Sequence, residues 1–394
     1  MRDQNSVFGL IRLAPAFLVL ACLQSSLHAA GEKQFSSETK LVARMEGCGG
    51  VCVEFSRDGK ALLTAGNESA RVWDAATFKP VTEPLYHGKG LTTARFSGDA
   101  RKVLTVGDSD ENDADKSTIR GRGARVWDAL TGRQLLSIPT HGQRPVFDAA
   151  INMDGSRVAT AAQDDNVACI WNTTTRQIDV RLNCRGPVLH VAFRPDSNTV
   201  MTIDQQDGLR QWDGKTGLPI GKTIAAKPFP RRAAYSANGK ILVIGSDAYF
   251  AVFDAATGEL KNDQDVENAQ RAVFNVAASG DGRVVAIAAS AFYGAQVWDA
   301  ETGLPIVHPT ITGDDRCILS GDGKLVIYRG VGDVAGMWDV TRNKRIQTFN
   351  FGSDFPNTFE DACFSPDDRR IAVTGSVGDG ITLVFSVTRN AASS

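Results

Sequence analysis

Apolar residues along the chain alternate with short polar turns in a unit that recurs from end to end. Each unit begins with an apolar run that ends in a turn of the Phe-Ser-x-Asp-Gly type, as at Phe55–Gly59 and Tyr235–Gly239. Asp-Gly and Asn-Gly supply the positive φ that a tight hairpin needs. A second apolar run follows, such as Ala61–Ala65, and a third strand then ends on an aromatic residue. The pattern predicts three consecutive antiparallel strands in every unit.

The aromatic residue that ends the third strand sets the length of the repeat. It recurs every 40 to 54 residues, at Trp73, Trp127, Trp171, Trp212, Phe253, Trp298, Trp338 and Phe385. A period of about 40 residues with three or four short strands is typical of a β-propeller. We therefore predict an all-β, eight-bladed propeller. The last unit stops at Val387 without an outer strand, so we expect the N-terminal segment Thr39–Met45 to complete that blade and close the ring.

The repeats resemble those of the WD-repeat family of β-propellers. The resemblance rests on the turns above and on five Trp-Asp pairs, which begin at Trp73, Trp127, Trp212, Trp298 and Trp338. It implies that the aromatic packs between neighbouring blades, that the Asp sits at the turn into the outer strand, and that the protein organises protein complexes.

The chain also departs from the WD-repeat pattern. No Gly-His dipeptide occurs, and only His87 and His141 stand at or near the corresponding loop position. We therefore expect the family's His–Ser/Thr–Asp–Trp hydrogen bonds to be mostly absent, with His141, Asp165 and Trp171 as a partial candidate. Asp-Ala-x-Thr-Gly segments are also similar to those of eight-bladed quinoprotein propellers and of an eight-bladed outer-membrane assembly lipoprotein. The quinoproteins, however, have a Trp after the Thr-Gly.

Composition and the N-terminus indicate where the protein works. Apolar residues make up 42% and charged residues 22% of the 394 residues, with a formal net charge of −2, which favours a soluble protein and argues against nucleic-acid binding. Residues 1–30 read as a signal peptide, because a short start flanked by Arg2 and Arg12 precedes the apolar run Leu13–Leu23, and small residues end the segment. We expect residues 31–394 to form a single exported propeller without a transmembrane segment, either free or lipid-anchored at Cys22. The six remaining cysteines form no zinc pattern and are expected to be buried.

Aligned on the turn aromatic, the first strands place polar residues at one position, three residues earlier. That position holds Cys52, Thr93, Asp148, His190, Arg232, Asn275, Arg316 and Asp361. Because side chains alternate along a strand, all eight should meet one environment, which we predict to be the central channel. In ring order Asp148 would face Arg316, His190 would face Asp361, and Arg232 would face Cys52. Two interpretations stay open for six of these residues, a solvated channel lining or a binding pocket. The six are Asp148, His190, Arg232, Asn275, Arg316 and Asp361.

Two further features lie in loops on the side of the ring where the first strands begin. A basic rim is predicted from five consecutive units, at Lys89, Arg144, Arg185, Lys227 and Arg271. It would attract a partner with an acidic surface. An insertion between Gly107 and Gly123 carries a weak calcium candidate, Asp108, Asp110, Asp113 and Asp115, which lacks the spacing of an EF-hand.

These features favour a binding scaffold: an exported, monomeric ring that binds a protein partner at the loops around the channel, without a cofactor. The alternative is a hydrolase or lyase at the channel mouth that uses Asp148, His190 and Asp361 as acid–base groups. The chain contains neither a GxSxG nucleophile elbow nor an HExxH zinc motif. The sequence therefore predicts that the protein is not an enzyme.

Overall fold

A computed structural model describes residues 39–47, 49–108, 122–138, 145–162, 166–195, 197–224, 230, 232–246, 249–265, 273–289, 295–307, 316–329, 335–349, 359–375 and 380–388. The chain divides into two units, Met1–Ser37 and Glu38–Ser394, and every described residue belongs to the second. The described residues form strands and turns without a helix. The predicted signal peptide, residues 1–30, lies outside them.

Thirty-two strands form eight four-stranded antiparallel sheets, which are the blades of a propeller. Blades 1 to 4 consist of β2 (Cys52–Phe55), β3 (Ala61–Ala65), β4 (Ser69–Asp74), β5 (Leu85–Tyr86); β6 (Thr93–Phe96), β7 (Lys102–Asp108), β8 (Arg122–Asp128), β9 (Gln134–Ile138); β10 (Asp148–Ile151), β11 (Arg157–Ala161), β12 (Val167–Asn172), β13 (Ile178–Asn183); and β14 (Val188–Phe193), β15 (Thr199–Asp204), β16 (Gly208–Asp213), β17 (Pro219–Ile224).

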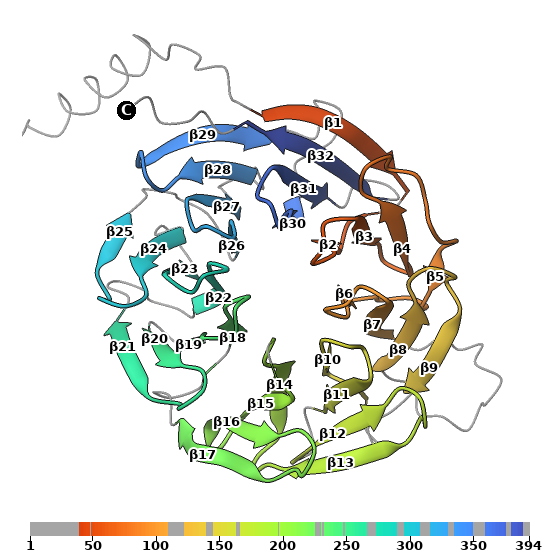
Figure 1. Cartoon of the computed structure of the whole chain (residues 1–394), viewed down its shortest axis with the longest axis vertical. Coiled ribbons are helices and arrows are strands. Elements are labelled where there is room, and N and C mark those ends of the chain that lie inside the picture. The colour runs from red at the N-terminus through yellow and green to blue at the C-terminus, as the bar shows by residue number, and fades with distance from the viewer. Residues whose placement is uncertain are drawn as a thin grey trace, which may run out of the picture. The chain divides into compact units, whose positions relative to one another are not determined.

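Blades 5 to 8 follow in the same order around the ring (Figure 1). They consist of β18 (Arg232–Tyr235), β19 (Ile241–Ser246), β20 (Tyr249–Asp254), β21 (Leu260–Asp265); β22 (Val273–Ala278), β23 (Val284–Ala289), β24 (Ala295–Asp299), β25 (Pro305–Val307); β26 (Cys317–Leu319), β27 (Leu325–Arg329), β28 (Ala335–Asp339), β29 (Lys344–Phe349); and β30 (Phe359–Phe364), β31 (Arg370–Gly375), β32 (Ile381–Val387), β1 (Thr39–Glu46).

The ring is closed by the N-terminal strand, as the sequence predicts. β1 pairs antiparallel with β32, from Thr39 opposite Val387 to Glu46 opposite Ile381. Figure 1 shows β1 as the outermost strand of the last blade. The two ends of the repeat array therefore share one sheet, which gives the last blade four strands like the others and closes the ring.

The turns of every blade fall on two opposite sides of the ring, because all four strands are antiparallel. We call the side with the first-to-second and third-to-fourth strand turns the hairpin face. The side with the second-to-third strand turns and the connections between blades is the loop face. On the hairpin face the predicted positive φ is present, for example 71° at Gly59 and 68° at Gly239.

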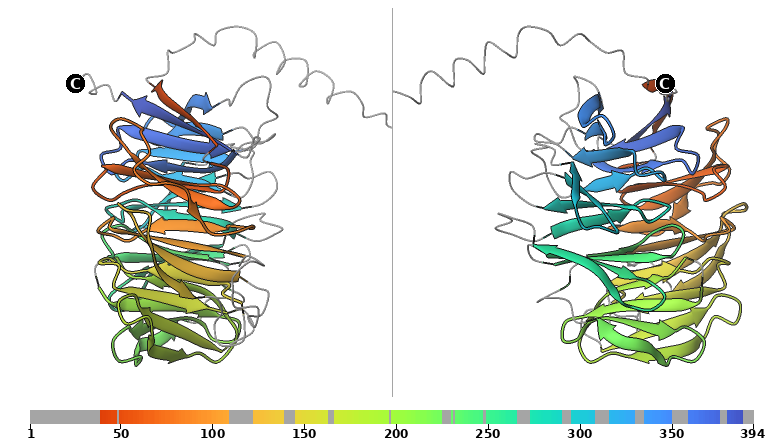
Figure 2. Two further views of the ribbon diagram at one scale, coloured as in Figure 1. Left: turned by 90° about the vertical axis from the view of Figure 1, so that its right-hand side faces the viewer. Right: turned by 60° about the vertical axis from the view of Figure 1, so that its left-hand side comes forward.

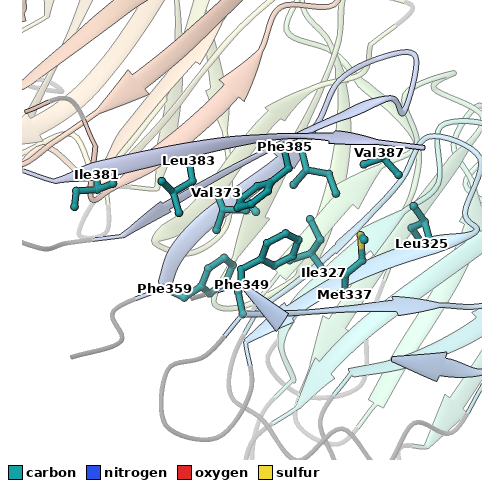
Figure 3. Close-up of a cluster of buried hydrophobic side chains, with 13 residues drawn as sticks. Leu325, Ile327, Met337, Phe349, Phe359, Val373, Ile381, Leu383, Phe385 and Val387 are labelled. Atoms are coloured by element: carbon teal, nitrogen blue, oxygen red, sulfur yellow. The ribbon is translucent and has the colours of Figure 1, made fainter. Parts of the chain in front are cut away.

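The core consists of apolar clusters, one between each pair of neighbouring blades. Trp127 of blade 2, for example, is 7% exposed and packs with Leu63 and Val72 of blade 1. Between blades 7 and 8 the rings of Phe349 and Phe385 lie 5.0 Å apart (Figure 3). The aromatic residue of each repeat therefore joins its blade to a neighbour, as the WD-repeat resemblance implies.

The aspartates of the Trp-Asp pairs stabilise the turns into the outer strands. Asp128 Oδ1 accepts hydrogen bonds from the backbone N–H of Leu130 at 3.1 Å and of Thr131 at 2.8 Å. These bonds favour the ionised carboxylate and lower the pKa of Asp128. The same arrangement recurs at Asp213 and Asp299.

Half of the ring keeps one hydrogen bond of the family set, the bond between Trp and threonine, although the sequence predicts that the set as a whole is mostly absent. In blades 1 to 4 the indole N–H donates to a threonine on the second strand at 2.8–2.9 Å, in the pairs Trp73–Thr64, Trp127–Thr105, Trp171–Thr160 and Trp212–Thr202. His87 Nδ1 also lies 2.7 Å from Thr105 Oγ1, so three of the four family groups meet in blade 2. His87 reaches this threonine without the Gly-His dipeptide. His141 and Asp165, the predicted partial set, lie outside the described residues.

Candidate functional site: the central channel and its two faces

The polar position of the inner strands faces the next blade. Asp148 Oδ2 accepts the backbone N–H of Val191 at 3.0 Å, and Asp361 Oδ2 accepts that of Val53 at 3.2 Å. Asn275 Oδ1 accepts the N–H of Cys317 at 3.3 Å, and Cys52 Sγ accepts that of Ala94 at 3.3 Å. An inner strand has no neighbouring strand on its channel side. The backbone N–H groups on that side therefore need other acceptors. Four of the aligned side chains supply them.

A histidine–carboxylate contact and an ion pair join adjacent blades at this position, where the sequence predicts pairs that face one another across the channel. His190 Nδ1 lies 2.6 Å from Asp148 Oδ2, and Arg316 donates to Asp361 Oδ1 at 3.2 Å. The sheets of a propeller stand face to face, so a side chain on an inner strand reaches the neighbouring blade before it reaches the far wall. Arg232, the corresponding residue of blade 5, is exposed.

Two charged residues of the channel, Glu54 and Arg95, are not among the channel residues that the sequence predicts. They stand two positions after Cys52 and Thr93, and therefore on the same side of their strands. Glu54 Oε2 accepts the N–H of Phe96 at 2.9 Å, which adds a second bond between blades 1 and 2. Arg95 is exposed and interacts electrostatically with Glu54 and Asp361. Strand alternation alone would have identified both residues.

The carboxylates of the channel wall lie between neighbouring strands, and this position changes their pKa values. Desolvation by burial raises the pKa of Glu54 and that of Asp361, although Arg95 and other cations oppose the shift. Partial desolvation at the channel wall lowers the pKa of Arg95, but the carboxylates of Glu54 and Asp361 outweigh this effect and raise that pKa overall. Burial also raises the pKa of Cys52 to about 12, so this thiol stays protonated at neutral pH.

The predicted basic rim is only partly within the described residues. Lys89 is exposed on the loop face. Arg185 is 70% exposed and its Nε lies 3.2 Å from Asp207 Oδ2. Arg144, Lys227 and Arg271 lie outside the described residues, so the rim of five cations stays a prediction.

The calcium candidate also falls outside what the structure describes. Asp110, Asp113 and Asp115 are not among the described residues, and neither is the side chain of Asp108 at the end of β7. Within the described ranges no group of three or more His, Cys, Asp or Glu side chains could hold a metal ion. The described cysteines Cys52, Cys169, Cys184, Cys317 and Cys363 are free thiols that are buried or partly buried.

Comparison with known proteins supports the propeller assignment. A family model described as outer membrane protein assembly factor BamB matches residues 115–343, and one described as WD domain, G-beta repeat matches residues 39–74. The first match covers more than half of the chain, so the chain belongs to that family of β-propellers, and its Trp-Asp repeats are of the WD type.

Individual relatives are distant. The chain is 21% identical over 216 residues to the transcriptional corepressor LEUNIG_HOMOLOG of Arabidopsis thaliana, which covers 54% of this chain and 24% of that protein. It is 24% identical over 186 residues to eukaryotic translation initiation factor 3 subunit I of Scheffersomyces stipitis, covering 43% of this chain and 52% of the other. The chain thus spans about a quarter to a half of these curated relatives.

Solved structures share the fold. The C-terminal WD40 domain of Sif2 aligns with a TM-score of 0.70 and 15% identity, covering 90% of this chain and all of that domain. The computationally designed Ika8 protein aligns with a TM-score of 0.67 and 19% identity over 88% of this chain and all of Ika8. As for membranes, the described residues contain no helix with the length and hydropathy to cross one.

Proposed function

We propose that this chain is an exported propeller scaffold that binds a protein partner on its loop face, around the mouth of the central channel. The observation that carries the proposal is the use of the inner-strand side chains. Asp148, Asn275 and Asp361 are bonded to the backbone of the next blade, so they form a rigid frame. Because these side chains are already bonded within the ring, we expect the loops that connect the strands to bind the partner.

The names of the relatives support a role in binding proteins. They describe a transcriptional corepressor, a subunit of a translation initiation factor and a retinoblastoma-binding protein homologue. The charge of the described loop face supports an acidic partner surface. Lys89 is exposed there, and Arg232 is exposed where β18 leaves that face. Two cations at a channel mouth would strengthen binding of an acidic segment and make it sensitive to salt.

The test is cross-linking co-purification of the full chain from cells that export it, in parallel with two double variants. K89E/R232E reverses two cations of the loop face, and K60E/R283E makes the same change of charge on the hairpin face. We expect K89E/R232E to lose a partner that the wild type and K60E/R283E both retain. Loss from K60E/R283E alone, or equal retention by all three proteins, would refute a loop-face site.

A second candidate function has one observation in its favour, the 2.6 Å contact between His190 Nδ1 and Asp148 Oδ2. A carboxylate that holds one ring nitrogen leaves Nε2 to accept a proton, which is the geometry of a general base. Asp361, the third predicted residue, is instead bonded to Arg316 and to the Val53 N–H. A turnover screen decides the matter: activity of the wild type that H190Q abolishes would support catalysis, and activity unchanged in H190Q would exclude this base.

A further inference from the structure

The hairpin face carries exposed cations at one equivalent position in six consecutive blades. The position follows the positive-φ residue of the first turn, and blades 5, 6, 7, 8, 1 and 2 place there Lys240, Arg283, Lys324, Arg369, Lys60 and Arg101. The side chains of Lys60 and Arg101 are each 86% exposed, and that of Arg283 is 85% exposed. Blades 3 and 4 have Ser156 and Asn198 instead.

A backbone hydrogen bond fixes this position in every blade. The carbonyl oxygen of the residue accepts the N–H of the residue that follows the Trp-Asp pair or its equivalent, at 2.7–3.0 Å in all eight blades. Examples are Ala75 N–H to Lys60, and Ala300 N–H to Arg283, each at 2.8 Å. The cations therefore project from rigid turns at one level of the ring. Figure 2 shows the ring from the side, with the turns of this face aligned along one edge.

Five of the six turns also carry an aspartate two residues before the cation, and its side chain is less exposed than the cation, for example 53% at Asp58 and 45% at Asp281. Asp58 Oδ1 accepts the Ser56 hydroxyl at 2.7 Å and the Lys60 N–H at 3.1 Å, so the carboxylate points back into its turn. Its other oxygen lies 4.0 Å from Lys60 Nζ. Asp281 repeats this geometry, at 3.8 Å from Arg283. The cations are the more exposed members of these pairs, and such long, exposed ion pairs are weak.

Three leucines protrude from the same face. Leu130, Leu218 and Leu304 are 74%, 64% and 64% exposed, in blades 2, 4 and 6. Each follows a Trp-Asp pair in the turn to the outer strand, and each has its backbone N–H held by that turn, as in Leu130 N–H to Asp128 Oδ1 at 3.1 Å. Single exposed leucines are common on soluble proteins, but three of them beside cations on one face suit insertion into a lipid interface.

The chain enters the ring on this face. Thr39, the first residue of β1, is opposite Val387 in the sheet, and the Val387 N–H bonds to the Arg369 carbonyl at 2.7 Å, beside one of the six cations. A lipid anchor at Cys22, suggested by the sequence, would join the ring through residues 23–38 at this point.

We propose that the hairpin face docks on a membrane that contains anionic lipids, with the six cations at the headgroups and the three leucines inserted between them. The charge of the six cations and the three exposed leucines together favour an anionic bilayer as the partner. Docking by this face leaves the loop face free on the opposite side of the ring. The inference therefore goes beyond the scaffold function and does not depend on the identity of a protein partner.

The test is co-flotation of the full chain with phosphatidylcholine vesicles that contain about one third phosphatidylglycerol, at low and at high salt. Each cation near an anionic surface strengthens binding about fivefold, so K60E/R283E should bind at least about tenfold more weakly. L130S/L218S/L304S should also bind more weakly, and this loss should persist at high salt. The matched control K89E/R232E should bind within about twofold of the wild type. All four proteins share the same N-terminal segment before β1, so any contribution of that segment is common to them.

Several outcomes would overturn the proposal. They are equal binding to vesicles of phosphatidylcholine alone, equal loss in K60E/R283E and K89E/R232E, or no binding of the wild type. Binding of the hairpin face to an acidic protein but not to vesicles would also overturn it. Circular dichroism of each variant separates lost binding from lost folding. A failed vesicle test leaves the loop-face co-purification unaffected, so the two proposals fail independently.

Discussion

The hydrogen bond between Trp73 and Thr64 should stabilise the ring mainly because both groups are buried. Trp73 Nε1 donates to Thr64 Oγ1 at 2.9 Å, and the two side chains are 7% and 0% exposed. Thr64→Val keeps the shape of the side chain but leaves the indole N–H buried without its acceptor. An unsatisfied buried donor costs about 1–3 kcal/mol, and we expect the free energy of unfolding to fall by that amount.

The chain itself supplies the matched comparison. In blade 8 the equivalent positions hold Phe385 and Val373, which pack without any hydrogen bond between them. The double variant T64V/W73F copies that pair into blade 1. Trp73→Phe alone leaves the Thr64 hydroxyl unsatisfied, whereas the double variant removes both polar groups. We therefore expect the double variant to be less destabilised than the sum of the two single variants, by about 1–2 kcal/mol.

Urea unfolding followed by circular dichroism measures all four proteins of this cycle. The guanidinium of Arg71 lies 5.1 Å from the Trp73 ring centroid. W73F and the double variant change this contact in the same way, so its contribution cancels from the coupling energy. Additive costs, with a coupling energy near zero, would show that the hydrogen bond does not stabilise the blade. The explanation of why blades 1 to 4 keep threonine would then be wrong.

Three further perturbations test the frame of the ring. Because burial raises the pKa of Glu54, its stabilising contribution is present below about pH 4 and is lost as the pH rises through the folded-state pKa. The variant E54Q should therefore flatten the pH dependence of the free energy of unfolding, measured with urea between about pH 4 and pH 7. Deletion of residues 31–46 removes β1, and with it the buried Met45, and should lower the unfolding free energy by at least about 3 kcal/mol; an unchanged melting temperature would contradict closure by β1. Arg370 of blade 8 donates to the carbonyls of Gly59 and Ala75 in blade 1, so R370M should cost about 2 kcal/mol in the same assay, and a cost near zero would count against this link.

The repeat period and the lone N-terminal strand sufficed to predict eight blades and their closure. Both are properties of strand pattern and spacing, which the sequence displays directly. The alignment of the inner strands also identified a position with one shared environment. It could not say that this environment is the next blade, because strand alternation fixes which side chains share a side but not what that side meets. Asp148 and Arg316 therefore contact adjacent blades instead of one another.

Other misses had signals that were present in the sequence. Glu54 and Arg95 follow the aligned position by two residues, so the same alternation places them on the same side. The threonines that receive the Trp hydrogen bonds occur only in blades 1 to 4, and Ile244, Ile287, Tyr328 and Val373 replace them in blades 5 to 8. In blades 5 and 8 the Trp is replaced by Phe253 and Phe385 as well, so donor and acceptor are lost together. Reading both strands jointly would have corrected the expectation based on Gly-His alone.

The most direct test of a rigid ring that recognises its partner through one face is site-specific photocross-linking. A photoreactive amino acid would replace Lys89 on the loop face, Lys222 on the outer strand β17, or Lys240 on the hairpin face, each of which is exposed. Our account predicts that a protein partner is cross-linked from position 89 and not from 222 or 240. A partner captured from position 222 or 240, with none from position 89, would contradict it.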